Sequence, residues 1–503
     1  MKRLIAILFF GVLVGNLYSA NYNILDYDAM PGQYSTPAIQ KAVDECNQNG
    51  GGTVLVPAGT YITGTIVLKS HVNLCLEPGA VLLASLDLKD YLKTFRTHGI
   101  IFCEDAEQVS IIGHGTIDAR GTEFYDTTQN HVYDEFDKSV VRQKENYMPE
   151  GQFYTDGPIK RKPKPGMCIT FYFCSQLKIE DITIKDTPEW ATRFAYCDDV
   201  NIRGISIYNN LLVPNSDGIH CTVSRNIRIS DCDIRAGDDA IILTGLSIDE
   251  ETPGYDMALQ NSHPFGNKSE YGENMAVTNC QLQSRSAGIR IGYGQHPLRR
   301  CTFSNIQIYG SNRGIGIFAH DAVDIEELIF TDIVIQTRLH NGQWWGNGEP
   351  IHISAISRFP GEKAGQVRNV QFNNIIATSE AGILLYGLDE SRLQNIRLNN
   401  VQLKIVRGKE TLTYGGNFDL RPATPIKMQM FEHDIPGIYA RYVDGLVIND
   451  FQLTWGPDLP DFFTHALECE HVTGLWLKGM EGTANPGCPE CQTVRLEDTD
   501  VVE

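Results

Sequence analysis

Short strand-like phrases recur along this 503-residue chain in one form: apolar, any, apolar, two polar residues, then apolar, any, apolar. Clear examples are LKIEDITI (177–184), VNIRGISI (200–207) and IRISDCDI (227–234), and LVINDFQL (446–453) still fits. One anchor position advances from phrase to phrase by 23, 27, 48, 26, 27, 42 and 26 residues: Ile179, Ile202, Ile229, Val277, Phe303, Phe330, Phe372 and Leu398. The larger steps are single units with long loops, or double units.

Alternating apolar residues broken by a polar pair indicate two short strands that meet at a bend. A period of about 25 residues with strand content indicates a solenoid, in which each repeat buries its apolar face on its neighbours. Leucine-rich repeats would need a leucine-rich consensus and helical stretches, and neither is present. The sequence therefore predicts an all-β fold, a right-handed parallel β-helix with coils about 4.8 Å apart. Asparagine pairs at the bends predict side-chain ladders: Asn373 and Asn374, Asn399 and Asn400.

The segment STPAIQKAVDECNQNGGGTVLVPAGTY predicts a helix at about 36–48, then a glycine-rich turn and a strand. Such a helix would cap the open end of the solenoid, as terminal repeats require. Long segments at about 120–165, 247–271 and 338–354 break the repeat and predict decorating loops. We expect one β-helix domain over 21–503 rather than the several domains that length alone suggests.

The first 20 residues, MKRLIAILFFGVLVGNLYSA, have the form of a secretory signal peptide: basic residues, an apolar run, then small residues. The apolar run is too short for a comfortable membrane span, so we expect export to the periplasm or the extracellular space. The formal net charge of −20 disfavours nucleic acid and anionic membranes as partners.

The chain contains 13 cysteines. Several occupy positions where the repeat wants a small buried residue, which predicts core packing for Cys75, Cys232, Cys280 and Cys301. The CPEC segment, Cys488 to Cys491, with Cys469 upstream, suggests a terminal disulfide. A zinc site would need a fourth ligand and a second pair, so we expect no metal and no cofactor.

Three acids crowd two phrases that follow one another along the repeat, NSDGIH (215–220) and AGDDAI (236–241). Aligned by the apolar residue after the turn, Asp217 and Asp239 share a column that continues to Ala287 and Arg313. Asp238 lies one residue earlier and points to the opposite face or into the turn. Clustered acids oppose one another's ionisation, so one should hold a proton near neutral pH. Glycoside hydrolysis uses such a difference in protonation, with one acid that donates a proton and one base that activates water. Calcium binding or a solvated turn would also explain the acids.

The set NSDG, GDDA one coil later and TPEW upstream resembles the N-x-D and G-D-D motifs of the polygalacturonase-like family, glycoside hydrolase family 28. The opening segment and LEPGAVLLAS are also similar, and the resemblance extends to about residue 460. It implies inverting hydrolysis of α-linked uronic-acid or rhamnogalacturonan chains on a parallel β-helix. It also implies that Asp238 is the general acid, that Asp217 and Asp239 position and activate water, and that Asn215 contacts substrate.

The family's two basic motifs are altered in this chain. SAG (286–288) places Ala287 where the family has histidine, and GIF (316–318) lacks the family's arginine and lysine. The register places Arg290 beside Gly316, one coil earlier than the family's arginine, and His220 at the same offset from Asp217. Both side chains would share a face with the acids, and a guanidinium there would bind a carboxylate or ring hydroxyls.

Further candidates for substrate contact lie in the third loop and in a basic run. Trp344 and Trp345 would stack on sugar faces from an exposed loop, and His352, with Glu349, or His320 would reach the same cleft. A run of four basic residues either attracts a polyanionic sugar or is only a solvated face: Lys160, Arg161, Lys162 and Lys164.

The expected function is that of an exported hydrolase of pectic or other acidic glycans, exo-acting because long loops wall off the groove. The altered basic set suggests a rhamnogalacturonan-like or branched substrate. One alternative is a β-helix polysaccharide lyase whose acids bind Ca²⁺. The other is a non-catalytic glycan-binding solenoid, for which Asp238→Asn would change nothing.

Overall fold

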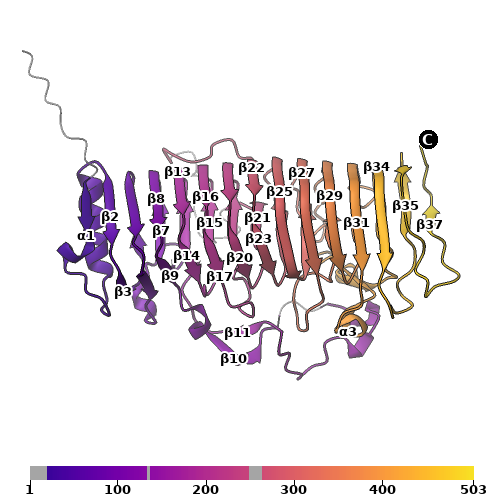
Figure 1. Ribbon diagram of the computed structural model, residues 1–503, viewed down its shortest axis with the longest axis horizontal. Coiled ribbons are helices and arrows are strands. Elements are labelled where there is room, and N and C mark those ends of the chain that lie inside the picture. The colour runs from indigo at the N-terminus through magenta and orange to yellow at the C-terminus, as the bar shows by residue number, and fades with distance from the viewer. Residues whose placement is uncertain (1–19, 133–135, 248–262, 503) are drawn as a thin grey trace, which may run out of the picture.

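The computed structural model describes residues 20–132, 136–247 and 263–502. Its strands form one 33-stranded sheet that winds into an elongated, right-handed β-helix (Figure 1). This confirms the predicted fold class. The predicted signal peptide lies outside the described residues except for Ala20, as do residues 248–262 of the second long loop. No helix in the described residues is long and apolar enough to cross a membrane.

Each coil contributes a strand to three strips that run along the solenoid. The first strip contains β1 (Asn21–Asn23), β2 (Gly52–Val56), β5 (Val72–Leu76), β8 (Glu107–Gly113), β13 (Ser175–Glu180), β16 (Asp198–Arg203), β19 (Arg225–Ser230) and β22 (Gly272–Thr278). The second contains β3 (Gly59–Thr63), β6 (Ala80–Ala84), β9 (Thr116–Asp118), β14 (Thr183–Lys185), β17 (Ser206–Tyr208), β20 (Asp233–Ala236) and β23 (Gln281–Ser284).

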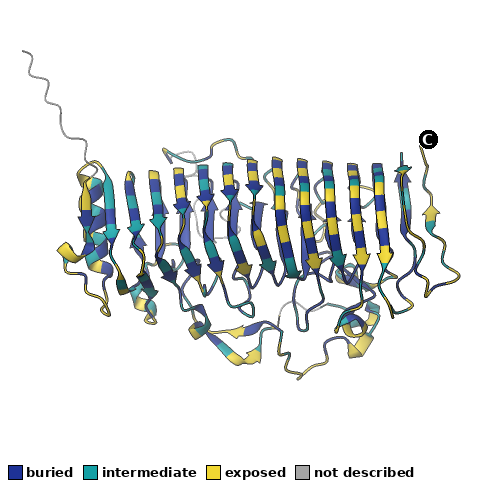
Figure 2. Ribbon diagram, viewed as in Figure 1, coloured by how far each residue is buried: buried dark blue, intermediate teal, exposed yellow. Residues whose placement is uncertain are grey.

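In the later coils these two strips merge into long bent strands. They are β25 (Leu298–Ser311), β27 (Ile325–Thr337), β29 (Val367–Ser379), β31 (Leu393–Ile405) and β34 (Ile438–Trp455), followed by the short β36 (Trp476–Lys478). Buried and exposed residues alternate along them because successive side chains point to opposite faces (Figure 2).

The third strip carries the candidate site. It contains β4 (Ile66–Val67), β7 (Ile101–Glu104), β12 (Ile169–Tyr172), β15 (Thr192–Ala195), β18 (Ile219–Thr222), β21 (Ile241–Gly245), β24 (Ala287–Gly294), β26 (Arg313–Phe318), β28 (Ile351–Ser354), β30 (Ile383–Tyr386), the first four residues of β34, β35 (Leu467–Thr473) and β37 (Val494–Glu497). Every residue of β18, β21, β26 and β28 is buried. The outer face of this strip is therefore covered, which keeps its polar side chains in place.

The predicted register of the repeat is confirmed along its whole length. Ile179 pairs with Ile202, which pairs with Ile229, and the series continues through the remaining anchors to Leu398. The 48- and 42-residue steps are single coils with long loops, because Ile229 pairs directly with Val277 and Phe330 with Phe372.

Side-chain ladders connect the coils inside and outside the solenoid. Phe303 stacks on Phe330 at 4.8 Å between ring centroids, and Phe330 on Phe372 at 4.9 Å, which matches the spacing between neighbouring strands. At the bends, Asn399 donates to Asn373 and Asn400 to Asn374, each at 2.9 Å. These are the asparagine ladders that the sequence predicts.

The N-terminal end is closed by α1 (Thr36–Gln48), which confirms the predicted capping helix. Pro37 occupies its first turn, where a missing N–H costs nothing. Ile39, Val43 and Cys46 are fully buried against the first coils, and α1 contacts β1 and β2.

Residues 120–165, here called the strap, leave the early coils and run along one side of the solenoid (Figure 1). Within the strap, β10 (Tyr125–Asn130) pairs antiparallel with β11 (Ile159–Arg161). Its middle reaches the loop that holds α3 (Thr411–Tyr414), where Arg142 donates to the oxygen of Gly416 at 3.0 Å. Close by, β32 (Asn417–Asp419) and β33 (Met430–Glu432) form a small antiparallel pair. The strap therefore connects parts of the solenoid far apart in sequence.

The cysteines follow the sequence interpretation with one difference. Cys488 and Cys491 form a disulfide, and Cys469 is a buried free thiol. Cys232, Cys280 and Cys301 are buried, whereas Cys75 is only half-buried.

Candidate functional site

The three aspartates lie at the turns that lead into β18 and β21. The amide of Gly218 donates to the carbonyl of Asp239 at 2.9 Å, the amide of Ala240 donates to that of Ala287 at 3.0 Å, and Ala287 pairs with Arg313. Residues 217, 239, 287 and 313 therefore form one column on consecutive coils, as the alignment predicts. Gly218 has to be small, because a Cβ there would lie 2.3 Å from the carbonyl oxygen of Ala240.

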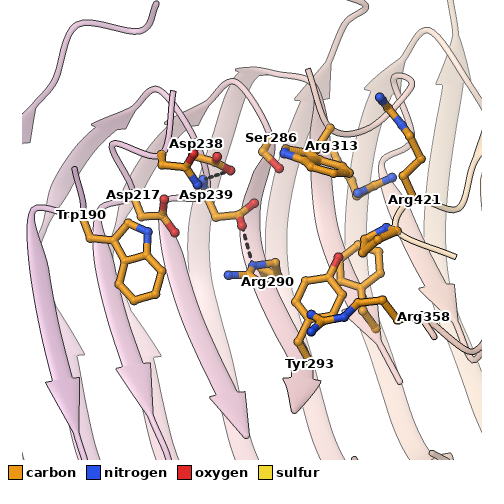
Figure 3. A pocket seen from close by; sticks show the side chains of 14 residues that line it. Trp190, Asp217, Asp238, Asp239, Ser286, Arg290, Tyr293, Arg313, Arg358 and Arg421 are labelled. Atoms are coloured by element: carbon orange, nitrogen blue, oxygen red, sulfur yellow. Dashed lines mark hydrogen bonds and ion pairs between the residues drawn. The ribbon is translucent and has the colours of Figure 1, made fainter. Parts of the chain in front are cut away.

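A cavity of about 160 Å³ opens over this column (Figure 3). The acids and Trp190 form one end of it, and arginine and aromatic side chains form the other. Its lining residues are Trp190, Asn215, Asp217, Asp238, Asp239, Ser286, Arg290, Tyr293, Arg313, Phe318, Trp345, Arg358, Arg421 and Pro422.

Asp238 lines this cavity beside Asp217 and Asp239 and does not point to the opposite face of the strip, which was one of its two predicted orientations. Its Oδ1 accepts the amide of Asp239 at 3.0 Å, and its own carbonyl accepts the hydroxyl of Ser284 at 2.6 Å. Burial and the neighbouring charge of Asp239 raise the pKa of Asp238 to about 7. Asp238 therefore holds a proton near neutral pH.

Asp217 is also buried and lies beside the other two acids. Burial, and then the charges of Asp238 and Asp239, raise its pKa well above the usual aspartate range. The charge of Asp239 raises the pKa of both Asp217 and Asp238, so the protonation of these two acids depends on their neighbours as well as on burial.

Asp239 has a partner at each carboxylate oxygen. Oδ1 accepts the amide of Ala287 at 2.8 Å, and Oδ2 lies 2.5 Å from Nε of Arg290. Arg290 lies beside Gly316 as the register predicts. Its guanidinium, however, is already held by Asp239 and lies over the ring of Tyr293 at 4.8 Å.

His220 is fully buried and does not line the cavity, so the expectation that it contacts substrate is wrong. Its Nδ1 is 3.4 Å from Oδ2 of Asp217, and its ring stacks on Trp190 with centroids 3.6 Å apart. Burial lowers its pKa well below the usual range, so the ring is neutral. Trp190 covers the face of His220 that we expected to be open to substrate. His220 therefore contacts Asp217 and Trp190 and holds them in position.

Two further expectations are corrected in the same way. His352 is fully buried between Glu349, at 3.4 Å, and the hydroxyl of Ser354, at 2.9 Å. His320 is also fully buried and bonds to Ser354 and to the carbonyl of Pro422. Neither ring reaches the cavity.

The two tryptophans of the third loop have different surroundings. Trp344 is only 2% exposed, and its Nε1 donates to the carbonyl of Asp156 in the strap at 2.8 Å, so it cannot stack on a sugar. Trp345 lines the cavity and lies against Arg421, whose guanidinium carbon is 5.1 Å from the ring centroid. Asn215 lines the cavity as well, with a left-handed φ of 55°.

Three arginines at the far end of the cavity were not among the predicted substrate-binding residues. Arg313 lies 3.5 Å from Glu349, Arg421 forms a two-bond pair with Asp419 at 2.8 Å each, and Arg358 lies 3.2 Å from Asp321. The Arg358 side chain is 26% exposed, against 3% for Arg313 and 2% for Arg421, so Arg358 is the most accessible of the three. Arg313 stood in the predicted column, but no sequence pattern marks Arg358 or Arg421.

The arrangement suits an anionic sugar: carboxyl groups that can donate and accept protons face a wall of guanidinium groups. Close groups of possible metal ligands among the described residues are Cys488–Glu490–Cys491 and His433–Glu468–Glu470. Neither group includes the three aspartates, and Cys488 and Cys491 are joined as a disulfide.

Comparisons with known proteins place these residues in a family context. The family model for glycosyl hydrolases family 28 matches residues 46–323, more than half of the chain and all three aspartates. A probable polygalacturonase of Vitis vinifera is 29% identical over 225 residues, which cover 41% of this chain and 40% of the relative. A polygalacturonase of Gossypium barbadense is 23% identical over 263 residues, which cover 51% of this chain and 58% of the relative. The chain thus spans about half the length of these relatives.

Two solved structures share the fold over most of the chain. An exopolygalacturonase from Thermotoga maritima superposes with a TM-score of 0.62 at 18% identity, covering 86% of this chain and 92% of the other. A family 28 exopolygalacturonase from Yersinia enterocolitica has a TM-score of 0.62 at 16% identity, covering 96% of this chain and 78% of the other. At these identities the likeness shows the fold alone. The match to the family model decides the assignment: the chain belongs to glycosyl hydrolases family 28.

Proposed function

We propose that this protein hydrolyses α-glycosidic bonds of pectic or other acidic glycans, with inversion at the anomeric carbon. The observation that carries the proposal is one cavity in which three buried aspartates face four arginines. Membership of the family and the polygalacturonase relatives support the same reaction.

The acid in this reaction is Asp238. With a pKa raised to about 7 it keeps a proton near neutral pH, and its carbonyl and Oδ1 are held by hydrogen bonds that fix its position. It donates that proton to the glycosidic oxygen as the bond from this oxygen to the anomeric carbon breaks.

Asp217 and Asp239 supply the base. Water attacks the anomeric carbon and gives one proton to a carboxylate of this pair, so the enzyme regains in total the proton that Asp238 gave away. Asp239, which is paired with Arg290 and accepts the amide of Ala287, is suited to accepting the proton, while Asp217 beside it is suited to orienting the water.

The arginine wall selects an anionic substrate. A guanidinium binds a carboxylate through two parallel bonds, and burial strengthens this contact. Because Asp239 already holds Arg290, the accessible Arg358 is the better candidate for a direct contact with a sugar carboxylate.

We further propose that the enzyme cleaves from a chain end and is exported as a single β-helix domain after loss of its signal peptide. Support for end-cleavage comes from the third loop, whose Trp345 lines the cavity and whose Trp344 donates to the carbonyl of Asp156 in the strap. The exopolygalacturonase neighbours, which share the fold, agree with it.

The test is a product assay on a panel of pectic and other acidic oligosaccharides with wild type and Asp238→Asn. We expect a saturated monosaccharide or short oligosaccharide from the wild type and a loss of at least about 1,000-fold in kcat for the variant. Asp26→Asn, an exposed acid in the N-terminal cap, is the matched control and should retain activity. An unsaturated product that absorbs in the ultraviolet, or activity that survives in Asp238→Asn, would overturn the proposal.

A further inference from the structure

A second cavity, of about 260 Å³, lies on the other side of Trp190 from the three aspartates. It shares Trp190 and Asn215 with the first cavity, so the two are adjacent along the same groove. Its lining residues are Arg96, Arg161, Lys164, Met167, Glu189, Trp190, Asn215 and Leu246.

The charge of this cavity is positive. Three cationic side chains line it, against the single carboxylate of Glu189. Glu189 lies 2.5 Å from Nζ of Lys164 and 3.3 Å from Nη2 of Arg96. In the described part of the chain, no carboxylate lies within ion-pair distance of Arg161. The protein as a whole has a net charge of −20, so this positively charged cavity differs in sign from the charge of the whole protein.

Two of the three cations are largely buried, whereas the third, Arg161, is exposed, and this distinguishes the cavity from a fully solvated surface. The side chains of Arg96 and Lys164 are only 19% and 15% exposed. Arg161 ends strand β11, whose pairing with β10 fixes its backbone. Trp190, the wall between the cavities, is fixed by its stacking on His220. A ligand that crosses this wall therefore meets preformed positive groups on both sides.

We propose that this cavity is a second anion subsite, in which Arg96, Arg161 and Lys164 bind the carboxylate of the sugar next to the one held over the aspartates. The inference rests on the proposed function. It gives a role to two residues of the basic run, Arg161 and Lys164, whereas Lys160 and Lys162 of the same run do not line the cavity.

This subsite restricts the class of substrate. With cations on both sides of the aspartates, the best substrate carries a carboxylate on two adjacent sugars. A backbone in which charged and neutral sugars alternate would leave one of the two cavities without an anion. The protein should therefore prefer runs of adjacent uronic acids to alternating chains, contrary to the rhamnogalacturonan-like substrate that the altered basic motifs suggest.

The experiment pairs changes in the enzyme with changes in the substrate. The substrates are a uronic-acid trisaccharide and its three derivatives in which one sugar at a time carries a neutral methyl ester. The variants are Arg161→Gln, at an exposed position, and Lys162→Gln, its exposed neighbour that does not line the cavity. We leave Lys164 unchanged because its loss would leave Glu189 without its closest cation.

We expect Arg161→Gln to lower kcat/KM on the fully charged trisaccharide by about tenfold, since a hydrogen bond to a charged group is lost. On one of the three esters, the one neutral at this subsite, the same variant should match the wild type, and Lys162→Gln should match it on all four substrates. If Arg161→Gln has the same effect on all four substrates, or no effect on any, the subsite is overturned while the hydrolase function stands. If the wild type cleaves none of the four, the proposed function is overturned and the inference with it.

Discussion

Arg290 and Asp239 form a buried ion pair across neighbouring coils. Nε of Arg290 lies 2.5 Å from Oδ2 of Asp239, and the two side chains are 11% and 6% exposed. The pair lies next to Ala287, the residue that replaces the family's usual histidine. The amide of Ala287 donates to the other oxygen of Asp239. An arginine held in this way compensates the charge of the acidic trio and is not free to bind substrate.

Arg290→Gln should therefore act on catalysis more than on substrate affinity. Without the guanidinium, Asp239 loses a buried partner, and Asp217 and Asp238, whose pKa values the arginine lowers, hold their protons more tightly. We expect kcat to fall by about 100-fold and the pH optimum to rise, with KM changed less than threefold. Arg290→Lys, which keeps the charge, should recover part of kcat. A large rise in KM at unchanged kcat would show instead that Arg290 binds the substrate directly.

Asp238→Asn should stabilise the protein at neutral pH while it removes activity. Because the folded state raises the pKa of Asp238 from 3.8 to about 7, its stabilising contribution is complete below pH 4 and is lost as pH rises toward 7. The asparagine variant does not titrate, so its free energy of unfolding at pH 8 should exceed that of the wild type by on the order of 2 kcal/mol. At pH 4 the two proteins should unfold alike. Urea unfolding at both pH values is the measurement, and an equal difference at both would mean that packing, not titration, causes the effect.

The solenoid could be predicted from the sequence because its pairing is repetitive. A strand that must bury one face beside an identical neighbour leaves an alternating apolar pattern, and this pattern gave the exact partners of Ile179, Ile229 and Phe330. The column of Asp217, Asp239 and Ala287 followed from the same register. Long loops carry no such period, so nothing in the sequence could place Arg358 or Arg421 opposite the acids.

The register also could not predict which side chains on the outer face of the third strip are covered by other residues. His220 and Arg290 lie in one column with Ile242 between them, as expected. Whether such a side chain meets substrate depends on what covers it, and Trp190 covers His220. Likewise, two adjacent tryptophans in a loop give no sign of which one packs inward.

The two tryptophans of the third loop should separate stability from binding. Trp344→Ala removes a buried ring and its bond to Asp156, and should cost about 3–5 kcal/mol of stability. Trp345→Ala removes a half-buried wall of the cavity and should raise KM by about tenfold with a much smaller loss of stability. Thermal unfolding and steady-state kinetics on the same two variants are the measurement. The opposite pattern would mean that the assignment of their roles is wrong.

Asp156 fastens the strap to the solenoid beside the third loop, and its removal should change how the enzyme cuts. Its carboxylate lies 2.5 Å from Arg285, 3.2 Å from His340 and 3.4 Å from Arg338. Asp156→Asn leaves the largely buried Arg285 without its carboxylate, which should cost about 2–3 kcal/mol of stability. It should also make the strap more sensitive to limited proteolysis. If the strap closes the groove, the loosened variant will admit longer chains and release a larger share of internal cleavage products.

The control for this variant is Asp137→Asn, which removes an acid from the same strap. Among the described residues, the carboxylate of Asp137 accepts only from Ser139, at 3.0 Å and 2.6 Å, and takes no part in the contacts of Asp156. Its product pattern should equal that of the wild type. Chain-length analysis of the products from a long uronic-acid polymer distinguishes the outcomes. If Asp156→Asn opens the strap to protease yet still cuts only at chain ends, closure of the groove must depend on other residues, because the strap would then be free to move without admitting the polymer.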